Sequence, residues 1–197
     1  MRVAQRQTRA RKTSFAQRVR VPLGFGYALL FLYLAKPRPL FLYPGIALAG
    51  LGSALRVWAS GHLNKGRELA VSGPYSWTRN PLYLGSFMMG LGFAVASASI
   101  WLLVLFLVLF PAIYVPVMRR EEEELRAAFG PRFATYQSGV PLFLPTRLSP
   151  WRPQYRDLAP FGGNFQWSKV ISNREYRALV GALAVAALIS AKMVLWR

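Results

Sequence analysis

The longest uncharged stretch of the chain occupies residues 81–118 and reads PLYLGSFMMGLGFAVASASIWLLVLFLVLFPAIYVPVM. As one helix, its 38 residues would extend about 57 Å, nearly twice the ~30 Å hydrocarbon core of a bilayer. The stretch must therefore fold back, and the small and hydroxyl residues at 96–99 (ASAS) mark the expected turn. Charged residues begin directly after it, at 119–124 (RREEEE). We predict a membrane hairpin with polar groups at its ends.

Three more apolar segments accompany this hairpin, at residues 21–35, 40–58 and 177–196. Apolar residues make up 54% of the 197 residues and are clustered, which is typical of an integral membrane protein. The first segment is shorter than the ~20 residues that a membrane helix usually needs. Within the hairpin, Gly85, Gly90 and Gly92 indicate close helix packing. The sequence predicts an all-α, polytopic membrane protein with about five transmembrane helices.

The same segments divide the chain into four parts. We expect a basic arm at residues 1–20, a membrane core at 21–146, an irregular connector at 147–175 and a C-terminal transmembrane helix at 176–197. Within the core, residues 119–129 should form a helix that continues the hairpin and stops at Gly130-Pro131. A loop rich in proline and aromatic residues should follow, up to residue 146.

Basic residues are distributed unevenly along the chain. Residues 1–20 hold seven Lys and Arg and no acid, so the positive-inside rule places the N-terminus in the cytoplasm. Five spans then put loops 59–80 and 119–176 on that same side, which holds 21 of the 25 basic residues when Arg56 and Arg177 at the span ends are counted. We expect a multi-pass protein, of the inner (plasma) membrane in a bacterium, with these loops facing the cytoplasm.

The net charge of +18 does not indicate a nucleic-acid-binding protein, because the basic residues flank apolar spans and no RNA- or DNA-binding motif accompanies them. Attraction to the bilayer's anionic headgroups explains the charge more simply. The chain has no cysteine and one histidine, His62, which we place in a loop. Disulfides, a thiol nucleophile and a Cys or His metal centre are therefore excluded, and we expect no metal site. No glycine-rich phosphate loop follows a strand, so a Rossmann fold is not supported.

Polar residues flank the hairpin at Arg79-Asn80-Pro81 and at the glutamates 121–124. Proline suits the first position of a helix, and the asparagine before it can cap the free amides, which gives the first group a purely structural interpretation. The same helix amides, with Arg79 and Asn80, can instead hold a polar ligand or a carboxylate. A glutamate run is usually a solvated helix face, but carboxylates this close to a membrane can also bind a cation or sugar hydroxyls. Both interpretations stay open for each group.

A longer pattern runs through both polar groups. It comprises Gly73-Pro74-Tyr75, Arg79-Asn80-Pro81, Tyr83, Gly85, Glu121-Glu122, Leu125, Phe129-Gly130, Tyr136, Val140-Pro141 and Pro145. In order and spacing, over residues 61–145, this pattern resembles the isoprenylcysteine carboxyl methyltransferase and phospholipid methyltransferase superfamily. Each piece is weak alone, but all of them in this order on either side of a membrane hairpin are specific.

The resemblance implies an integral membrane enzyme that uses S-adenosylmethionine without a Rossmann domain. Its cofactor pocket would face the cytoplasm and would be formed by the Arg79-Asn80-Pro81 motif, the helix after the hairpin and the loop that contains Val140. An amphiphilic lipid or prenylated substrate would enter laterally from the bilayer.

The resemblance also implies roles for individual residues. Tyr75, Arg79, Asn80, Pro81 and Tyr83 would line the cofactor or reaction site, and Glu121, Glu122, Val140 and Pro141 would complete the cofactor pocket. Methyl transfer from a sulfonium is a direct displacement, which needs alignment more than a strong acid or base. Arg79 or Arg120 would orient a substrate carboxylate. Glu121 would hold the cofactor's ammonium group or ribose hydroxyls, and Glu122 would serve as a base only with an amine acceptor.

Two positions depart from the family pattern. Asn80 stands where the usual motif is Arg-His-Pro, so the site has no titratable group there. Leu142 follows Pro141 where many relatives carry arginine, which changes contacts to cofactor or substrate. Residues 147–197 lie outside the resemblance.

We expect carboxyl O-methylation of an isoprenylcysteine-type thioether, with N-methylation of a phospholipid amine as the alternative. A different enzyme class is a nicotinamide-dependent enzyme like the membrane sterol reductases, some of which share a related C-terminal architecture. That class has few candidate proton donors here beyond Tyr75 and Tyr83. A non-enzymatic, basic lipid-binding protein would instead tolerate alanine at Arg79 and Glu121.

Overall fold

The computed structural model describes residues 15–64, 68–145 and 164–195. Within these ranges every regular element is a helix, so the all-α prediction is confirmed. The elements are α1 (Phe15–Leu34), α2 (Pro39–His62), the 3₁₀ helix η2 (Gly73–Ser76), α3 (Pro81–Ala96), α4 (Ile100–Phe129), α5 (Pro131–Gly139), α6 (Trp167–Ser172) and α7 (Tyr176–Leu195).

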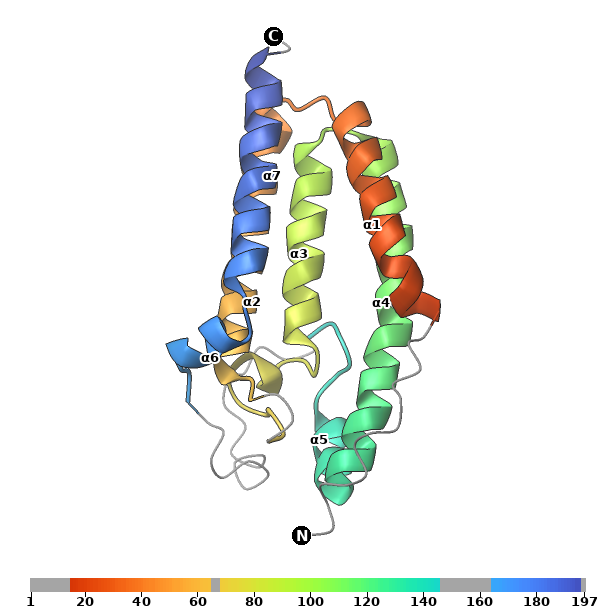
Figure 1. Cartoon of the computed structure of the whole chain (residues 1–197), viewed down its shortest axis with the longest axis vertical. Coiled ribbons are helices and arrows are strands. Elements are labelled where there is room, and N and C mark those ends of the chain that lie inside the picture. The colour runs from red at the N-terminus through yellow and green to blue at the C-terminus, as the bar shows by residue number, and fades with distance from the viewer. Residues whose placement is uncertain (1–14, 65–67, 146–163, 196–197) are drawn as a thin grey trace.

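The long helices α1, α2, α3, α4 and α7 run side by side as a bundle (Figure 1). The short elements η2, α5 and α6 gather at one end of it, where the last turns of α4 extend beyond the other helices (Figure 1). The described parts of the two loop regions predicted to share one side of the bilayer therefore do lie at a common end. Which side of the membrane that end faces stays a prediction.

The hairpin turns where the sequence predicted. Helix α3 ends at Ala96, α4 begins at Ile100, and the connection contains Ala98 with a left-handed φ of 52°. The Ser97 hydroxyl donates to the Ala94 carbonyl at 2.6 Å, and the Ser97 carbonyl accepts from the Lys36 amide at 2.9 Å. The second bond attaches the connection between α1 and α2 to the hairpin turn.

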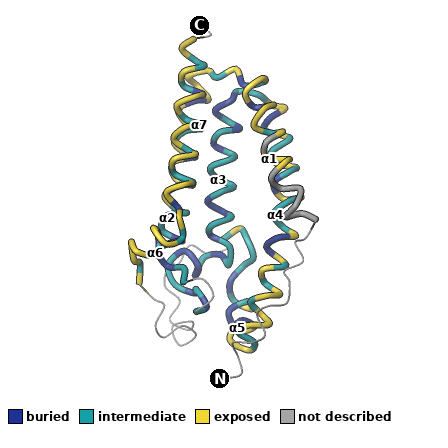
Figure 2. Tube along the Cα trace, viewed as in Figure 1, coloured by how far each residue is buried: buried dark blue, intermediate teal, exposed yellow. Residues whose placement is uncertain are grey.

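Three helices within the described residues are long and apolar enough to cross a bilayer, namely α2, α4 and α7. The apolar part of α1, Pro22–Leu34, and the 16-residue α3 are shorter, so the predicted count of five spans is not confirmed. Helix α3 lies in the middle of the bundle, and its trace is coloured buried or intermediate while the outer helices carry the exposed residues (Figure 2). Its neighbours shield α3 from lipid, which relaxes the need for a full-length apolar surface of its own.

Helices α2 and α3 pack backbone against backbone. A Cβ placed on Gly45 would lie 2.5 Å from the Gly92 carbonyl oxygen, and one placed on Gly52 would lie 2.6 Å from the Gly85 oxygen. The two glycine pairs are seven residues apart on both helices, so one face of each antiparallel helix carries them. Such small residues allow helices to approach closely in a membrane, where lipid is as apolar as leucine. The predicted packing role of Gly85 and Gly92 is confirmed, while Gly90 faces the Phe106 ring of α4.

Several boundaries differ from the sequence predictions. Helix α1 begins at Phe15, inside the predicted arm, and α2 continues to His62, which is therefore the last residue of a helix and not part of a loop. The segment predicted as a loop after α4 is largely helical: Gly130 has a φ of 52° and ends α4, and Pro131 then starts α5. The described part of the connector contains α6. Residues 1–14 and 146–163 lie outside the described part of the chain.

Candidate functional site

The segment that precedes α3 is tied to the segment that ends and follows α5. The Arg79 amide donates to the Pro141 carbonyl at 2.9 Å, and the Tyr136 hydroxyl donates to the Tyr75 carbonyl at 2.6 Å. The Leu142 carbonyl accepts from the Thr78 hydroxyl at 3.2 Å and from the Asn80 amide group at 3.0 Å. We call these two segments, residues 75–80 and 136–142, the clamp. It joins the predicted motif to the predicted Val140-Pro141 loop.

Asn80 acts in the clamp and not as a helix cap. It occupies the N-cap position of α3, but its side chain makes no capping hydrogen bond. Its Nδ2 donates to the Leu142 carbonyl instead. The capping interpretation of the sequence is therefore wrong. Pro81 does occupy the first turn of α3, where its missing N–H has no cost.

Arg79 connects the clamp to the helix after the hairpin. Its Nη1 donates to the Gln137 carbonyl at 2.8 Å, and its Nε lies 2.6 Å from Oε1 of Glu122 on α4. The Arg79 and Glu122 side chains are only 10% and 13% exposed. This distance is that of a close ion pair. The pair thus joins the clamp to α4 through opposite charges in a mostly buried position.

The electrostatics of this pair reflect burial. Burial raises the pKa of Glu122 above its usual range, and the positive charges of Arg79, Arg126 and Arg119 offset only part of that shift. Burial also raises the pKa of the Tyr75 hydroxyl, and the nearby carboxylates of Glu121 and Glu175 raise it further. Tyr75 therefore stays a neutral phenol, and Glu122 is a carboxylate that gains from an additional positive partner.

The two neighbouring glutamates divide their contacts between different partners. Glu121 Oε1 accepts a hydrogen bond of 2.8 Å from the Tyr83 hydroxyl of α3, whereas Glu122 faces Arg79. Consecutive residues of a helix point about 100° apart, so one acid reaches α3 and the other reaches the clamp. The Tyr83 ring also packs against Tyr114 of α4, with centroids 5.4 Å apart. Both ends of the hairpin thus meet through side chains.

Most of the predicted site residues are brought together. Four of them belong to the clamp, namely Tyr75, Arg79, Asn80 and Pro141. Glu122 is paired with Arg79 of the clamp, and Tyr83 and Glu121 are hydrogen-bonded to each other across the hairpin. Pro81 is buried beside Asn80, and Val140 is buried in an apolar cluster with Phe133 and Tyr136. Arg120 forms its ion pair along α4, with Glu124 at 3.7 Å, so its role at the site stays a prediction. Among the described residues, no group of three or more His, Cys, Asp or Glu could hold a metal ion.

Sequence reasoning missed a second ion pair next to the site. Glu175, at the start of α7, accepts hydrogen bonds from Nε of Arg56 at 3.1 Å and from Nη2 at 2.9 Å. The same guanidinium donates through Nη1 to the Leu82 carbonyl at 3.2 Å and to the Ser86 hydroxyl on α3. The sequence did offer an indication of Arg56, because it is a charged residue close to the end of an apolar segment. Its partner lies 119 residues away, which no local pattern indicates.

The connector is fixed beside this pair. Asn173 donates from Nδ2 to the carbonyls of Ser60 and Leu63 at 3.1 and 3.2 Å, and the Gln166 amide donates to the Gly61 carbonyl at 3.0 Å. These bonds satisfy carbonyls that the end of α2 leaves without helical partners. The C-terminal region is thus docked on the same end of the bundle as the clamp.

Comparison with known proteins agrees with the resemblance seen in the sequence. Residues 42–132 match the sequence model described as phospholipid methyltransferase. The cobalt-zinc-cadmium resistance protein CzcN of Cupriavidus metallidurans is 34% identical over 116 residues, which cover 58% of this chain and 53% of that protein. The nickel-cobalt-cadmium resistance protein NccN of Alcaligenes xylosoxydans xylosoxydans is 33% identical over 120 residues, covering 60% and 54%. The chain spans about half the length of these curated relatives, and no solved structure matches it.

Proposed function

We propose that this chain transfers a methyl group from S-adenosylmethionine to a lipid-linked acceptor, because its residues 42–132 match the phospholipid methyltransferase family. The reaction would take place where the clamp meets α4, at the end of the bundle that we expect to face the cytoplasm. The observation that carries this proposal is the convergence of Arg79 and Glu122 from the two ends of the hairpin.

The residues present fit the cofactor. Its amino acid portion has an ammonium and a carboxylate group, which need an acidic and a basic partner in a partly dry site. Arg79 and Glu122 supply a mostly buried guanidinium and carboxylate next to each other, and Glu121 supplies a second carboxylate. We propose that Arg79 holds the carboxylate, and that Glu121 and Glu122 hold the ammonium group or the ribose hydroxyls.

The bound cofactor would supply an electrophilic methyl group on a sulfonium, so the protein has to align the acceptor and exclude water. The clamp supports this task, because its hydrogen bonds hold Arg79 and Asn80 in fixed positions relative to Pro141 and Leu142. Asn80 positions the loop and cannot accept a proton at neutral pH. Tyr83 keeps Glu121 oriented through its hydroxyl.

We propose a carboxylate of an isoprenylcysteine type as the acceptor, with a phospholipid amine as the alternative. A carboxylate is ionised at neutral pH and needs no base, whereas an amine must lose a proton before it attacks. Glu122 faces Arg79, and Asn80 replaces the family's histidine, so the groups suited to act as a base are engaged or absent at these positions. This arrangement favours the acceptor that needs no deprotonation.

The names of the two relatives, CzcN and NccN, refer to resistance to cobalt, zinc, cadmium and nickel. We propose that any contribution of this chain to metal tolerance depends on methyl transfer. Growth of a deletion strain on cobalt, zinc and cadmium, complemented with the intact chain or with its Arg79→Ala variant, tests this link. Complementation by both would separate metal tolerance from the proposed activity.

Calorimetric titration of the purified protein with S-adenosylhomocysteine tests the cofactor assignment. We expect binding by the intact protein, loss of binding in Arg79→Ala and Glu121→Ala, and retained binding in Arg132→Ala and Glu123→Ala, which change exposed charges on α5 and α4. Absence of binding by the intact protein would refute the proposal. Binding of NADPH instead would favour the reductase-like alternative, and equal behaviour of all variants would favour a lipid-binding scaffold.

A further inference from the structure

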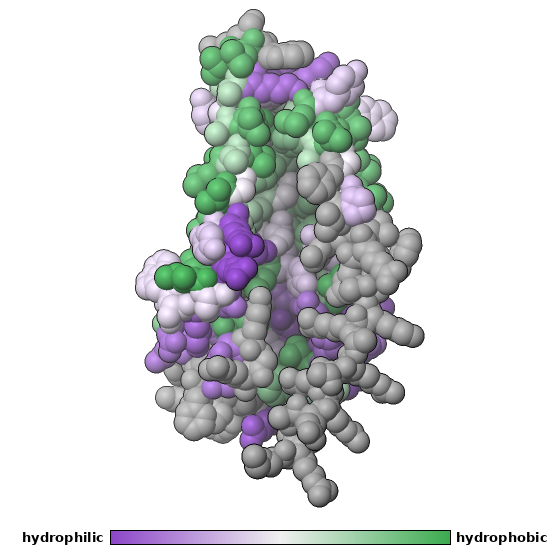
Figure 3. Space-filling model, in the orientation of Figure 1, coloured by the Kyte–Doolittle hydropathy of each residue, from purple (hydrophilic) through white to green (hydrophobic). Residues whose placement is uncertain are grey.

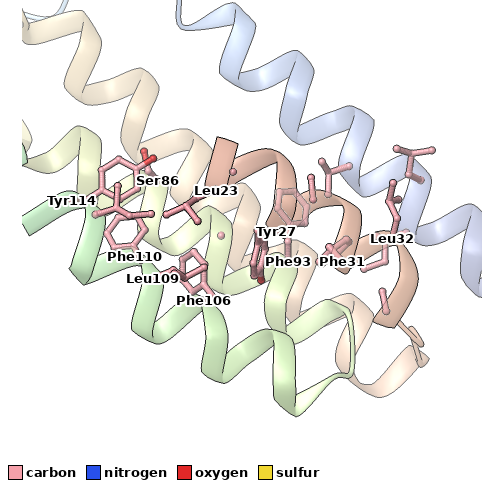
Figure 4. Close-up of a pocket in the computed structure, with 18 of the residues that line it drawn as sticks. Leu23, Tyr27, Phe31, Leu32, Ser86, Phe93, Phe106, Leu109, Phe110 and Tyr114 are labelled. Carbon is pink, nitrogen blue, oxygen red and sulfur yellow. The ribbon is translucent and has the colours of Figure 1, made fainter. Parts of the chain in front are cut away.

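A cavity of about 400 Å³ lies within the apolar part of the bundle, between α1, α3, α4 and α7 (Figure 4). Its walls are almost entirely hydrocarbon, with Tyr27, Phe93, Phe106 and Phe110 among the lining residues. The space-filling view shows the same side of the molecule hollowed lengthwise between α7 and α1 (Figure 3). The cavity is therefore accessible to a molecule that resides in the bilayer.

One end of the cavity adjoins the candidate active site. Tyr114 and Ser86 lie together at this end (Figure 4). The Tyr114 ring packs against Tyr83, whose hydroxyl donates to Glu121. Ser86 accepts a hydrogen bond from Arg56, which is paired with Glu175. Polar groups are thus concentrated where a head group would need them.

A charged residue lies at the opposite end. Lys192 of α7 lines the cavity, and its Nζ donates to the Leu32 carbonyl of α1 at 2.5 Å. Leu32 lies at the end of the cavity farthest from Tyr114 (Figure 4). Lys192 lies in the last turn of α7, and this contact ties α7 to α1 there.

Helix α7, which lies outside the family segment, forms one wall of the cavity with Val185, Leu188 and Ile189. It is fixed at both ends, by the pair of Glu175 with Arg56 at its start and by Lys192 near its end. The Glu175 side chain is only 8% exposed, and breaking a buried pair by removing one partner is costly. The wall is therefore held at a defined distance from α1.

We propose that this cavity holds one hydrocarbon chain of the methyl acceptor, with its head group towards Glu121, and that Lys192 sets the longest chain that fits. The inference rests on the proposed function and assigns to the C-terminal helix the selection of a single-chain amphiphile. The volume lies at the lower end of the range for small-molecule pockets, which suits one chain better than two. Along α1, the lining residues Leu23 to Leu32 span about 14 Å, a length that an extended chain can follow.

Selection in such a cavity works by exclusion. A chain that leaves the bilayer for the cavity exchanges one apolar environment for another, so each added methylene brings little hydrophobic gain. Chains longer than the cavity meet Lys192 and must bend or displace it, which is unfavourable in a closely packed space. The proposal therefore predicts a cutoff in chain length and not a steady rise of affinity with length.

Photolabelling of the full-length protein in mixed micelles tests occupancy without requiring methyl transfer. The probe is N-acetyl-S-hexadecylcysteine with a diazirine at the end of its chain. We expect labelled peptides from the ends of α1 and α7 near Leu32 and Lys192, with competition by unlabelled probe. Labelling spread over all lipid-facing helices, without competition, would overturn the proposal.

Two glycines of α1 provide a matched pair of variants. Gly24 lines the cavity and Gly26 does not, and a Cβ added to either meets nothing within 4 Å. Gly24→Leu should fill the cavity and lower both labelling and kcat/KM roughly tenfold, the scale of an overpacked site. Gly26→Leu should leave both unchanged. Equal effects of the two substitutions would contradict the assignment.

Acceptors that differ in chain length and number test the selection. With dodecyl, hexadecyl and icosyl probes, we expect a cutoff that moves to longer chains in Lys192→Ala, while S-adenosylhomocysteine affinity stays the same. Lysophosphatidylethanolamine as acceptor shows whether an amine head group can replace the carboxylate. Diacyl phosphatidylethanolamine shows whether a second hydrocarbon chain is tolerated. Preference for the diacyl lipid, or an unchanged cutoff in Lys192→Ala, would overturn the proposal. Loss of S-adenosylhomocysteine binding by the intact protein would refute the methyltransferase function instead, because labelling does not depend on it.

Discussion

The α2–α3 pair and the α1–α7 pair use their membrane faces in opposite ways. Gly45 and Gly52 bring the backbone of α2 against that of α3, so that no side chain fits between them. Helices α1 and α7 stand apart and leave a cavity between them, bordered by α3 and α4. The first pair leads directly into the clamp, through η2 and Pro81, and the second leads to Lys192.

This difference suggests a division between positioning and accommodation. A backbone-to-backbone contact has almost no freedom to shift, so it can hold Arg79 and Asn80 in register with α5. A pair of helices joined through Lys192 at one end can admit a flexible chain between them. Rigid support on one side and open space on the other are what alignment of a lipid-borne acceptor requires.

The most severe test of the rigid side is Gly52→Leu. A Cβ at Gly52 would lie 2.6 Å from the Gly85 oxygen and 2.7 Å from the Met89 nitrogen, and backbone atoms cannot rotate away. We expect little folded protein, because the two helices would have to separate. Gly50→Leu is the control on the same helix, since a Cβ there meets nothing within 4 Å. Size-exclusion profiles and thermal melts in detergent measure the difference, and similar melts would show that the close contact is not required.

A smaller loss is expected when the anchor of α7 is broken. Glu175→Gln leaves Arg56 without its counter-charge in a mostly buried position, at a cost of about 3 kcal/mol. Replacing both residues, as in Arg56→Met with Glu175→Leu, should recover much of that loss because no unpaired charge remains. Thermal melts of the single and double variants measure the recovery. A double variant less stable than the single one would mean that the pair has a further role.

Glu122 should make binding of the cofactor analogue depend on pH. Burial raises its folded-state pKa, so its contribution to stability is present below the unfolded value of about 4.3 and is lost as the pH rises through the raised value. The ionised form holds the ligand's ammonium group, so S-adenosylhomocysteine binding should weaken as the pH falls through that same raised value. Glu122→Gln should bind about tenfold more weakly and without this pH dependence. Glu123→Gln, on the exposed side of α4, should keep both the affinity and its pH dependence. Calorimetric titrations with S-adenosylhomocysteine at several pH values measure both.

The smallest effect is expected at the clamp. Asn80→Ala removes one hydrogen bond to the Leu142 carbonyl and should cost about 1 kcal/mol of stability. Asn80→His restores a donor and should recover that stability, while it adds a group that titrates near neutral pH. Activity of Asn80→His that changes with a midpoint near that of histidine, unlike the intact protein, would confirm that position 80 faces the reaction. An Asn80→Ala protein as stable as the parent would show that this bond contributes nothing.

The sequence predicted the turn at Ser97, the stop of α4 at Gly130 and the packing role of Gly85 and Gly92, because each depends on local composition. It did not predict α5, since a proline-rich segment suggests a loop until the preceding glycine is seen to end one helix and free Pro131 to begin another. A helix cap was one of the two interpretations that the sequence left open for Asn80, and its hydrogen bond to the Leu142 carbonyl excludes it. That carbonyl lies 62 residues away, beyond any local pattern.

By itself, the sequence determined a helical membrane protein, a hairpin over residues 81–118 and the family motif at its two ends. Uncharged runs, turn residues and motif spacing are local properties that survive without any tertiary contact. Only the tertiary structure decided that Glu121 faces Tyr83 while Glu122 faces Arg79, and that Glu175 anchors α7 to Arg56. Those choices depend on the directions in which helices present their side chains and on the distances between helices, which packing alone sets.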